Sequence, residues 1–160
     1  MIPRLLNAIR RNHALEHATV AVLLATSGPT RLAGRASTDG FVIIGDIAPA
    51  TLEQAAREAL RRLQAGQSGL AVTPLCGTNI ATTAGLAALG ATAVLARGRA
   101  RERLPNAFVA AIFGAMAGQP LGRLVQKYIT TLADHADIEV VGTRTLFGKL
   151  HKVETRSTAR

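Results

Sequence analysis

The sequence predicts an α+β protein in which an apolar helical hairpin interrupts a small, mostly antiparallel sheet domain with one packed helix. Three observations support this fold class. A helical pattern opens the chain, two runs without charged residues occupy its middle (77–96 and 104–122), and strand-like segments flank them on both sides. A chain of 160 residues is expected to form one domain, here with an appended element. The predicted organisation is a domain of residues 1–76 and 130–156, a hairpin of residues 77–126, and a disordered tail of residues 157–160.

The first predicted helix, Pro3 to Thr26, combines aliphatic and ionisable residues on one face. At about 100° per residue, that face carries His13, Glu16 and His17 in the middle of an apolar stripe. Burying two imidazoles and a carboxylate is costly unless they are paired or bound. The stripe is made of Leu5, Leu6, Ile9, Val20, Leu23 and Leu24, with Arg4, Arg11, Ala14 and Ala18 expected on the other side.

The next elements follow from turn residues and periodicity. Asp39-Gly40 is typical of a hairpin turn between two strands. An amphipathic helix capped near Thr51 follows, and Gly66 closes it. After Tyr128 the alternating pattern returns and can complete the sheet. The predicted spans are strands 31–37 and 41–47, a helix 51–65, a short strand 70–75, and strands 137–145 and 149–155.

The two charge-free runs are each about as long as a bilayer-spanning helix, which needs ~20 residues. A short arginine-rich link, 97–103, joins them, as in a helical hairpin. The alternative is that both helices are buried in a soluble bundle or an oligomer. Gly114, Gly118 and Gly122 give the second helix a small-residue face suited to close helix packing, and we expect homo-oligomerisation through it. The predicted location is a membrane, multi-pass, with the orientation open.

The net charge of +9 is almost entirely arginine. Such a balance permits contact with nucleic acid or an anionic membrane. Nucleic-acid binding usually adds exposed aromatics or a dense basic helix, and aromatics make up only 3% of the chain. We therefore expect the lipid bilayer, and no specific nucleic acid, as a partner.

His13 and His17 lie four residues apart, one above the other on a helix, so they can share one cation. Glu16 lies beside them and can handle a proton on a metal-bound water, with zinc as the expected metal. The pattern H-x-x-E-H is the inverted zinc-peptidase motif. The alternative is a pair of core histidines bonded to Glu16 and to backbone carbonyls.

Three further residues could carry chemistry. Cys76, the single cysteine, is a candidate third zinc ligand, with a small buried apolar residue as the alternative. His135 could join a metal site, but we expect it in a polar surface loop. His151 lies in a basic strand and is expected to be exposed.

Four segments resemble an uncharacterised family of small bacterial membrane proteins, a domain of unknown function: Arg11-Asn-His-Ala-Leu-Glu-His-Ala-Thr19, Leu32-Ala-Gly-Arg-Ala-Ser37, Cys76-Gly-Thr-Asn79 and Gln119-Pro-Leu-Gly122. This resemblance implies a membrane location, the bacterial inner membrane, and no established activity. The order of H-x-x-E-H helix, β-hairpin and amphipathic helix is also remotely similar to the start of pitrilysin/insulinase-type peptidases. That resemblance implies zinc binding by His13 and His17 and a general base at Glu16. A third, glutamate ligand from a later helix would be Glu53 or Glu58 by position.

These observations leave two main functions open. The first is a membrane-associated metalloprotein in which His13 and His17 bind the metal and Cys76 or a glutamate completes the site. In its catalytic form it would be a metallopeptidase or another metal-dependent hydrolase with Glu16 as general base. The second is a non-enzymatic membrane protein whose hairpin docks partners or copies of itself, with a structural His-Glu-His cluster. A basic peripheral module on anionic lipid or nucleic acid is a third idea.

Overall fold

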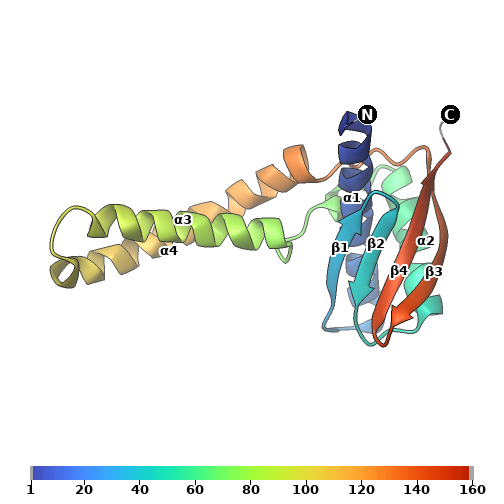
Figure 1. Ribbon diagram of the computed structural model, residues 1–160, viewed down its shortest axis with the longest axis horizontal. Coiled ribbons are helices and arrows are strands. Elements are labelled where there is room, and N and C mark those ends of the chain that lie inside the picture. The colour runs from blue at the N-terminus through green and yellow to red at the C-terminus, as the bar shows by residue number, and fades with distance from the viewer. Residues whose placement is uncertain (1, 159–160) are drawn as a thin grey trace. The chain divides into compact units, whose positions relative to one another are not determined.

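The computed structural model describes residues 2–158, which form two compact units (Figure 1). Within the described residues, the first unit comprises 2–72 and 130–158, and the second comprises Thr73–Ile129. The first holds helices, a sheet and the hydrophobic core, and the second is a helical hairpin. The predicted α+β fold class with an inserted apolar hairpin is confirmed.

The sheet of the first unit is fully antiparallel, with the strand order β1-β2-β4-β3. The strands are β1 (Ala33–Ser37), β2 (Gly40–Ile44), β3 (Ile138–Phe147) and β4 (Leu150–Ser157). The predicted Asp39-Gly40 turn joins β1 to β2, and Gly40 has a φ of 135°, a backbone conformation that favours glycine. The C-terminal strands complete the sheet as expected, because β4 pairs with β2.

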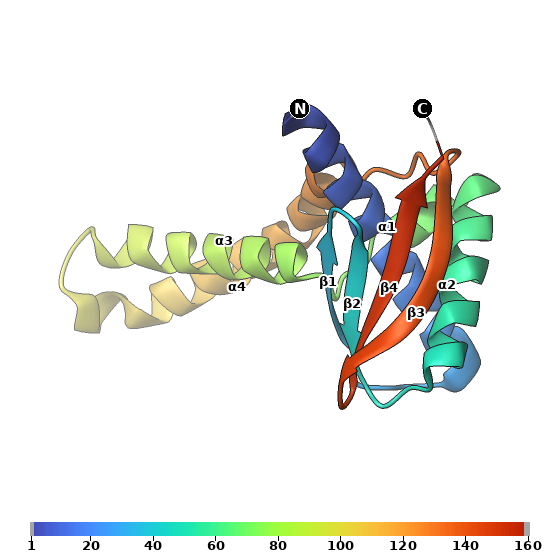
Figure 2. The same cartoon turned by 45° about the vertical axis from the view of Figure 1, so that its right-hand side comes forward.

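Helices α1 (Ile2–Ser27) and α2 (Pro49–Gln64) pack on one face of this sheet, as Figure 2 shows. Phe41 and Ile43 of β2 and Val153 of β4 are fully buried there. Alternate residues of a strand point to the same face, so the β2 pair belongs to one inward face. The core is completed by Leu15 and Leu23 of α1 and by the apolar stripe of α2.

The predicted burial of α1 is wrong for two groups of residues. Ala14 and Ala18, expected opposite the core, are 0% exposed, whereas Leu5 and Leu6 are exposed. The middle of α1, from Ala14 to Thr19, is buried on every side, because it contacts α2, β1, β2 and a 3₁₀ turn, η1 (Ser68–Ala71). A helix enclosed in this way has no single apolar face.

Two further predictions are wrong, the short strand at residues 70–75 and the start of the C-terminal tail. Residues 70–75 do not form a strand: Gly66, with φ 88°, ends α2, and the chain turns directly into η1. The Leu70 N–H then donates to the Gln67 carbonyl, which keeps the segment helical. The predicted tail begins too early, because Ser157 belongs to β4 and the Thr158 N–H donates to the Asp137 carbonyl. Residues 159–160 lie outside the described part of the chain.

The second unit packs α3 (Gly77–Leu95) against α4 (Ala100–Val125), which runs on into a π-helical turn, η2 (Gln126–Thr130). The glycines predicted as a close-packing face make this contact. A Cβ at Gly118 would lie 2.5 Å from the Thr83 Cα, and one at Gly114 or Gly122 would collide with Leu86 or Asn79 of α3. Self-association through the same glycines remains a prediction.

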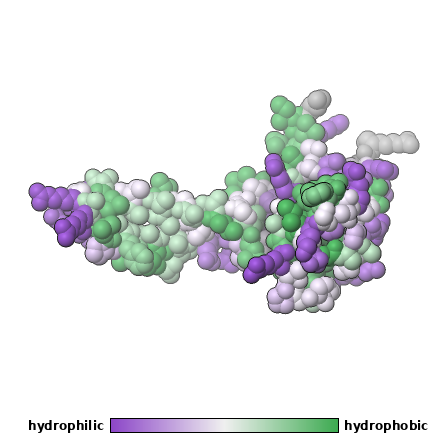
Figure 3. All heavy atoms as spheres, turned by 60° about the horizontal axis from the view of Figure 1, so that its bottom comes forward, coloured by the Kyte–Doolittle hydropathy of each residue, from purple (hydrophilic) through white to green (hydrophobic). Residues whose placement is uncertain are grey.

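Two helices of the described chain are long and apolar enough to cross a membrane, Gly77–Leu95 and Ala100–Thr130. At about 1.5 Å per residue, the 19 residues of α3 span about 28 Å, close to the ~30 Å of a hydrocarbon core. Figure 3 shows apolar residues on the hairpin surface and hydrophilic ones at its loop end.

Candidate metal centre

His13 and His17 lie on successive turns of α1 with their rings in contact. The ring centroids are 4.3 Å apart and the planes meet at 63°. The ring nitrogens that could bind a metal lie within 4.8 Å of each other. His17 is buried and His13 is partly buried. The i, i+4 spacing therefore brings the two imidazoles together, as the sequence predicted.

Both imidazoles are oriented by main-chain carbonyls. His17 Nδ1 lies 2.8 Å from the Ala71 oxygen, and His13 Nδ1 lies 3.0 Å from the Thr130 oxygen. A carbonyl only accepts a hydrogen bond, so each Nδ1 carries the proton and donates it. In a neutral imidazole of that tautomer, Nε2 holds the lone pair. Histidine ligands of metals are commonly held in this way.

The same two carbonyls mark where the chain leaves and re-enters the first unit. Ala71 directly precedes Val72, the last residue of the unit before the hairpin, and Thr130 is the first residue after it. The Leu132 N–H donates to the Arg10 carbonyl, 3.1 Å away, which is a further hydrogen bond between α1 and the segment that follows the hairpin. The H-x-x-E-H helix thus anchors both ends of the segment into which the hairpin is inserted.

Glu16 is buried, and its carboxylate lies against β1 at Gly34. A Cβ at position 34 would collide with Glu16 Oε1, so this approach requires glycine there. The ligand-capable atoms that gather at His13 and His17 do not include a Glu16 oxygen. The structure places Glu16 beside the histidine pair on the helix, with its carboxylate turned toward β1.

Sequence reasoning missed Gly34. A glycine inside a predicted strand was the available signal, because such a residue often marks a close approach of another group to the backbone.

The glutamates proposed as a third ligand by analogy are engaged elsewhere. Glu53 accepts hydrogen bonds from Arg57 and from the Thr143 N–H, 3.0 Å away. Glu58 pairs with Arg61 and Arg62 of α2. That expectation is wrong, because within the described residues neither glutamate belongs to the group of possible ligand atoms at His13 and His17.

Cys76 is buried and occupies the N-cap position of α3, in the second unit. It follows Ala71, the residue that His17 binds, by five positions in the chain. Five extended residues span at most about 17 Å. The covalent connection therefore limits how far Cys76 can lie from Ala71.

The other two histidines are buried, contrary to expectation. His135 is 2% exposed and donates from Nε2 to the Arg11 carbonyl, 2.9 Å away. His151 is 4% exposed and lies 3.0 Å from the Thr145 hydroxyl. Each is hydrogen-bonded within the fold, and neither joins the His13–His17 pair.

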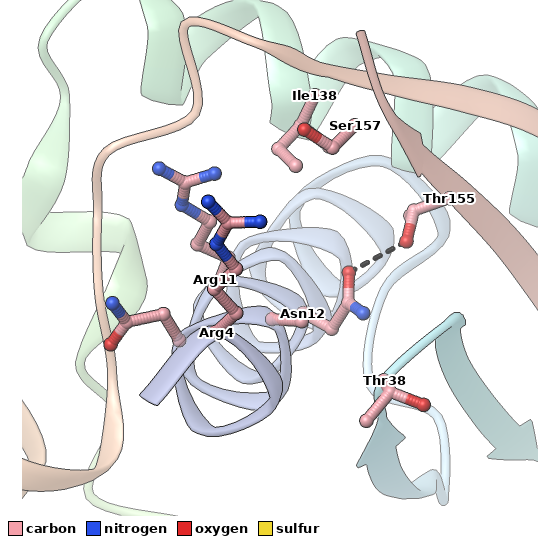
Figure 4. A pocket seen from close by; sticks show the side chains of 9 residues that line it. Arg4, Arg11, Asn12, Thr38, Ile138, Thr155 and Ser157 are labelled. Carbon is pink, nitrogen blue, oxygen red and sulfur yellow. Dashed lines mark hydrogen bonds between the residues drawn. The ribbon is translucent and has the colours of Figure 1, made fainter. Parts of the chain in front are cut away.

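Asn12, next to the motif, fastens α1 to the sheet. Its amide donates to the Ser37 carbonyl, 2.8 Å away, and its oxygen accepts from the Thr155 hydroxyl at 2.7 Å, as drawn in Figure 4. On the same side of α1, Arg11 pairs with Asp134 and Asp137. The Ser157 hydroxyl, followed by the charge of Arg11, lowers the pKa of Asp137. These contacts fix which side of α1 faces the sheet.

A hollow of about 400 Å³ opens beside these contacts and is lined by Arg4, Arg11, Asn12 and Thr38, among others (Figure 4). It lies on the side of α1 opposite the histidines, because Arg11 and His13 are separated by about 200° around the helix. The hollow is therefore separate from the candidate metal centre.

Comparison with known proteins places the chain in a family. Residues 8–143 match a family described as a domain of unknown function, DUF6391. An uncharacterised protein of the cyanobacterium Picosynechococcus sp. is 38% identical over 136 residues, which cover 77% of this chain and 65% of that protein. The chain thus spans about two thirds of the length of this relative. No solved structure matches. Because the match covers the H-x-x-E-H helix, most of the sheet and the whole hairpin, the chain belongs to the DUF6391 family.

Proposed function

We propose that this is a membrane-anchored metal-binding protein in which His13 and His17 bind a divalent cation, zinc, with Cys76 as a third ligand. The observation that carries the proposal is the pair of Nδ1-to-carbonyl hydrogen bonds at Ala71 and Thr130. They select the tautomer in which both Nε2 atoms offer a lone pair. A purely apolar core position would need neither imidazole.

Cys76 enters the proposal through its chemistry and its place in the chain. Two imidazoles and one thiolate make a zinc donor set with a fourth position left for water. The tether of five residues to Ala71 supports its inclusion. A bound zinc ion would acidify the water in that position.

The membrane part of the proposal rests on the hairpin. Both helices have spanning length, and the basic residues of the hairpin lie at its ends, in the link 97–103 and at Arg123 and Lys127. Retention in the membrane pellet after alkaline carbonate supports insertion. Release as a protein that is monodisperse without detergent contradicts it.

The metal is tested by elemental analysis of the full chain purified in detergent. We expect close to one zinc per chain, and loss of it in His13→Ala and in His17→Ala. His151→Asn, which alters a buried histidine of β4, is the matched control and should retain the metal. Wild-type protein that is free of metal and takes up no zinc on titration would refute the site. Cys76→Ser should weaken zinc binding, and unchanged affinity would remove sulfur from the ligand set.

Glu16 separates a catalytic site from a structural one. Within the proposal its carboxylate would serve as the general base beside a bound zinc ion, which would make the protein a metal-dependent hydrolase of the peptidase type. Glu16→Gln keeps shape and hydrogen bonding but cannot accept a proton. We expect it to retain metal and fold and to abolish hydrolysis of a peptide library that wild type cleaves. Loss of metal in Glu16→Gln would show that Glu16 is itself a ligand.

One observation favours a second candidate, a non-enzymatic membrane protein. The two histidines bind the residues at which the hairpin leaves and returns, so they have a structural task without any metal. In that case His13→Ala and His17→Ala lower thermal stability, and wild type contains no zinc. The elemental analysis above therefore decides between the two functions.

A further inference from the structure

The first two turns of α1 carry a row of exposed aliphatic side chains. Ile2, Leu5, Leu6 and Ile9 follow the i, i+3, i+4, i+7 spacing of one helix face, and all four are exposed, Ile2 at 72% and Leu6 at 54%. Farther along α1, the residues on this side are His13, Glu16 and Val20, which are buried or partly buried. The helix thus projects an apolar stripe beyond the core that its middle helps to form.

Basic residues lie on the opposite face of this helix and on the neighbouring strand β1. The first 15 residues contain three arginines and no acidic residue, although negative charge is what stabilises a helix N-terminus. Arg35 of β1 lines a hollow together with Ile9. Within residues 2–158, neither Arg4 nor Arg35 is ion-paired with a carboxylate.

We propose that the first two turns of α1 lie in the headgroup region of an anionic bilayer. The aliphatic stripe enters the boundary of the acyl chains, and Arg4 and Arg35 bind lipid phosphates. An apolar helix face accompanied by basic residues is typical of helices that lie in the membrane interface. This contact is additional to the hairpin and rests on the membrane location in the proposed function.

The chain contains no Trp, so one introduced Trp is a clean fluorescent reporter. Leu6→Trp is placed in the stripe of the full chain, and Gln54→Trp, on the exposed side of α2, is the matched control. Both variants are reconstituted into vesicles of phosphatidylcholine with and without phosphatidylglycerol, and flotation is checked first. Lipids brominated near the headgroup should quench Leu6→Trp about twofold and leave Gln54→Trp unquenched.

Quenching should be stronger in vesicles with phosphatidylglycerol, and Arg4→Gln with Arg35→Gln should remove this difference. Protein that floats with the vesicles while Leu6→Trp emits like Trp in water overturns the proposal and leaves the hairpin anchor intact. A blue-shifted emission without quenching also overturns it, because protein then covers the stripe. Failure to float overturns both the anchor and this contact.

Discussion

Helix α2 of the first unit and the two helices of the hairpin bury different sets of residues. In the first unit, the buried residues of α2 are all apolar: Leu52, Ala55, Ala56, Ala59, Leu60 and Leu63. In the second unit, α3 buries a single residue, the polar Asn79, and α4 buries Ala107, Gly118 and Gly122. Large apolar side chains of the hairpin, such as Leu89 and Phe113, are exposed. The first pattern suits a protein surrounded by water, and the second suits helices surrounded by lipid.

The two units are also stabilised by different contacts. Apolar area removed from water stabilises the first unit. In the hairpin the helices approach so closely at Gly90, Gly114 and Gly118 that main chain meets main chain. The buried Asn79 amide nitrogen donates to the Pro74 carbonyl, 3.0 Å away. Dispersion and hydrogen bonds replace the hydrophobic effect where the surrounding medium is itself apolar.

The largest expected effect comes from the same leucine-to-alanine substitution made once in each unit. Leu15→Ala removes a side chain that is 0% exposed, and it should lower the free energy of unfolding by about 2–5 kcal/mol. Leu89→Ala deletes the same atoms from a hairpin position that is 65% exposed, and it should change stability by less than ~0.5 kcal/mol in detergent. Thermal unfolding followed by circular dichroism measures both. Equal losses would break the comparison, because Leu89 would then be buried in a bundle.

A second, smaller effect tests the glycine contact. Gly118→Leu forces a side chain against the Thr83 main chain and should destabilise the hairpin by about 1–3 kcal/mol. Gly85→Leu is the control, since a Cβ at that position meets nothing within 4 Å. Protease sensitivity of the link 97–103 and thermal unfolding in detergent report the difference. If Gly118→Leu changes the oligomeric state and leaves hairpin stability unchanged, the face binds another copy.

The smallest expected effect comes from breaking an ion pair. Within residues 2–158, all ion pairs lie in the first unit except Arg99–Glu102 in the hairpin. The hydrogen bond from Lys152, followed by that from Ser37, lowers the pKa of Asp39 from 3.8 to about 2. A depressed carboxyl pKa stabilises the fold above the unfolded value, and this contribution is lost as the pH falls from 3.8 through 2. Because Asp39 is largely exposed, Asp39→Asn should lower stability at neutral pH by less than ~1 kcal/mol.

The melting temperature, measured from neutral pH down to pH 2, checks this prediction. Asp39→Asn should show a shallower decline than wild type in the window below pH 3.8. Asp46→Asn, which breaks the solvent-exposed pair with Lys149, is the comparison and should have a smaller effect at neutral pH. Identical curves for wild type and Asp39→Asn would show that the Lys152 contact is not maintained in solution.

Most elements of the fold could be predicted because they are encoded locally. Short patterns mark where strands and helices begin or end to within a few residues: the Asp39-Gly40 turn, the charge-free runs and Gly66. The burial of α1 could not be predicted in this way. Periodicity shows which residues share a face, but it does not show that α2, η1 and two strands surround the helix, so it cannot predict the burial of Ala14 and Ala18.

The candidate site was predictable only in part. The juxtaposition of His13 and His17 follows from helix geometry. Their carbonyl partners at Ala71 and Thr130 depend on contacts between residues far apart in the chain, which no local pattern records. The burial of His135 and His151 has the same origin, because the sheet register and the contacts of α1 enclose them.

The strand order has a consequence for biosynthesis. Strand β2 pairs on one side with its sequence neighbour β1 and on the other with β4, which the ribosome delivers only after the whole hairpin. Until then β2 has an open edge, a place where strands of other chains can add. Once β4 has been synthesised, a folded hairpin favours its pairing with β2, because the two ends of the hairpin meet where the Thr73 N–H donates to Gln126 Oε1, 3.0 Å away. A closed hairpin removes most of the loop-closure entropy that would otherwise be lost when β4 pairs with β2 across residues 73–129. A nascent chain that fails to form the hairpin therefore leaves the edge of β2 unpaired and open to aggregation.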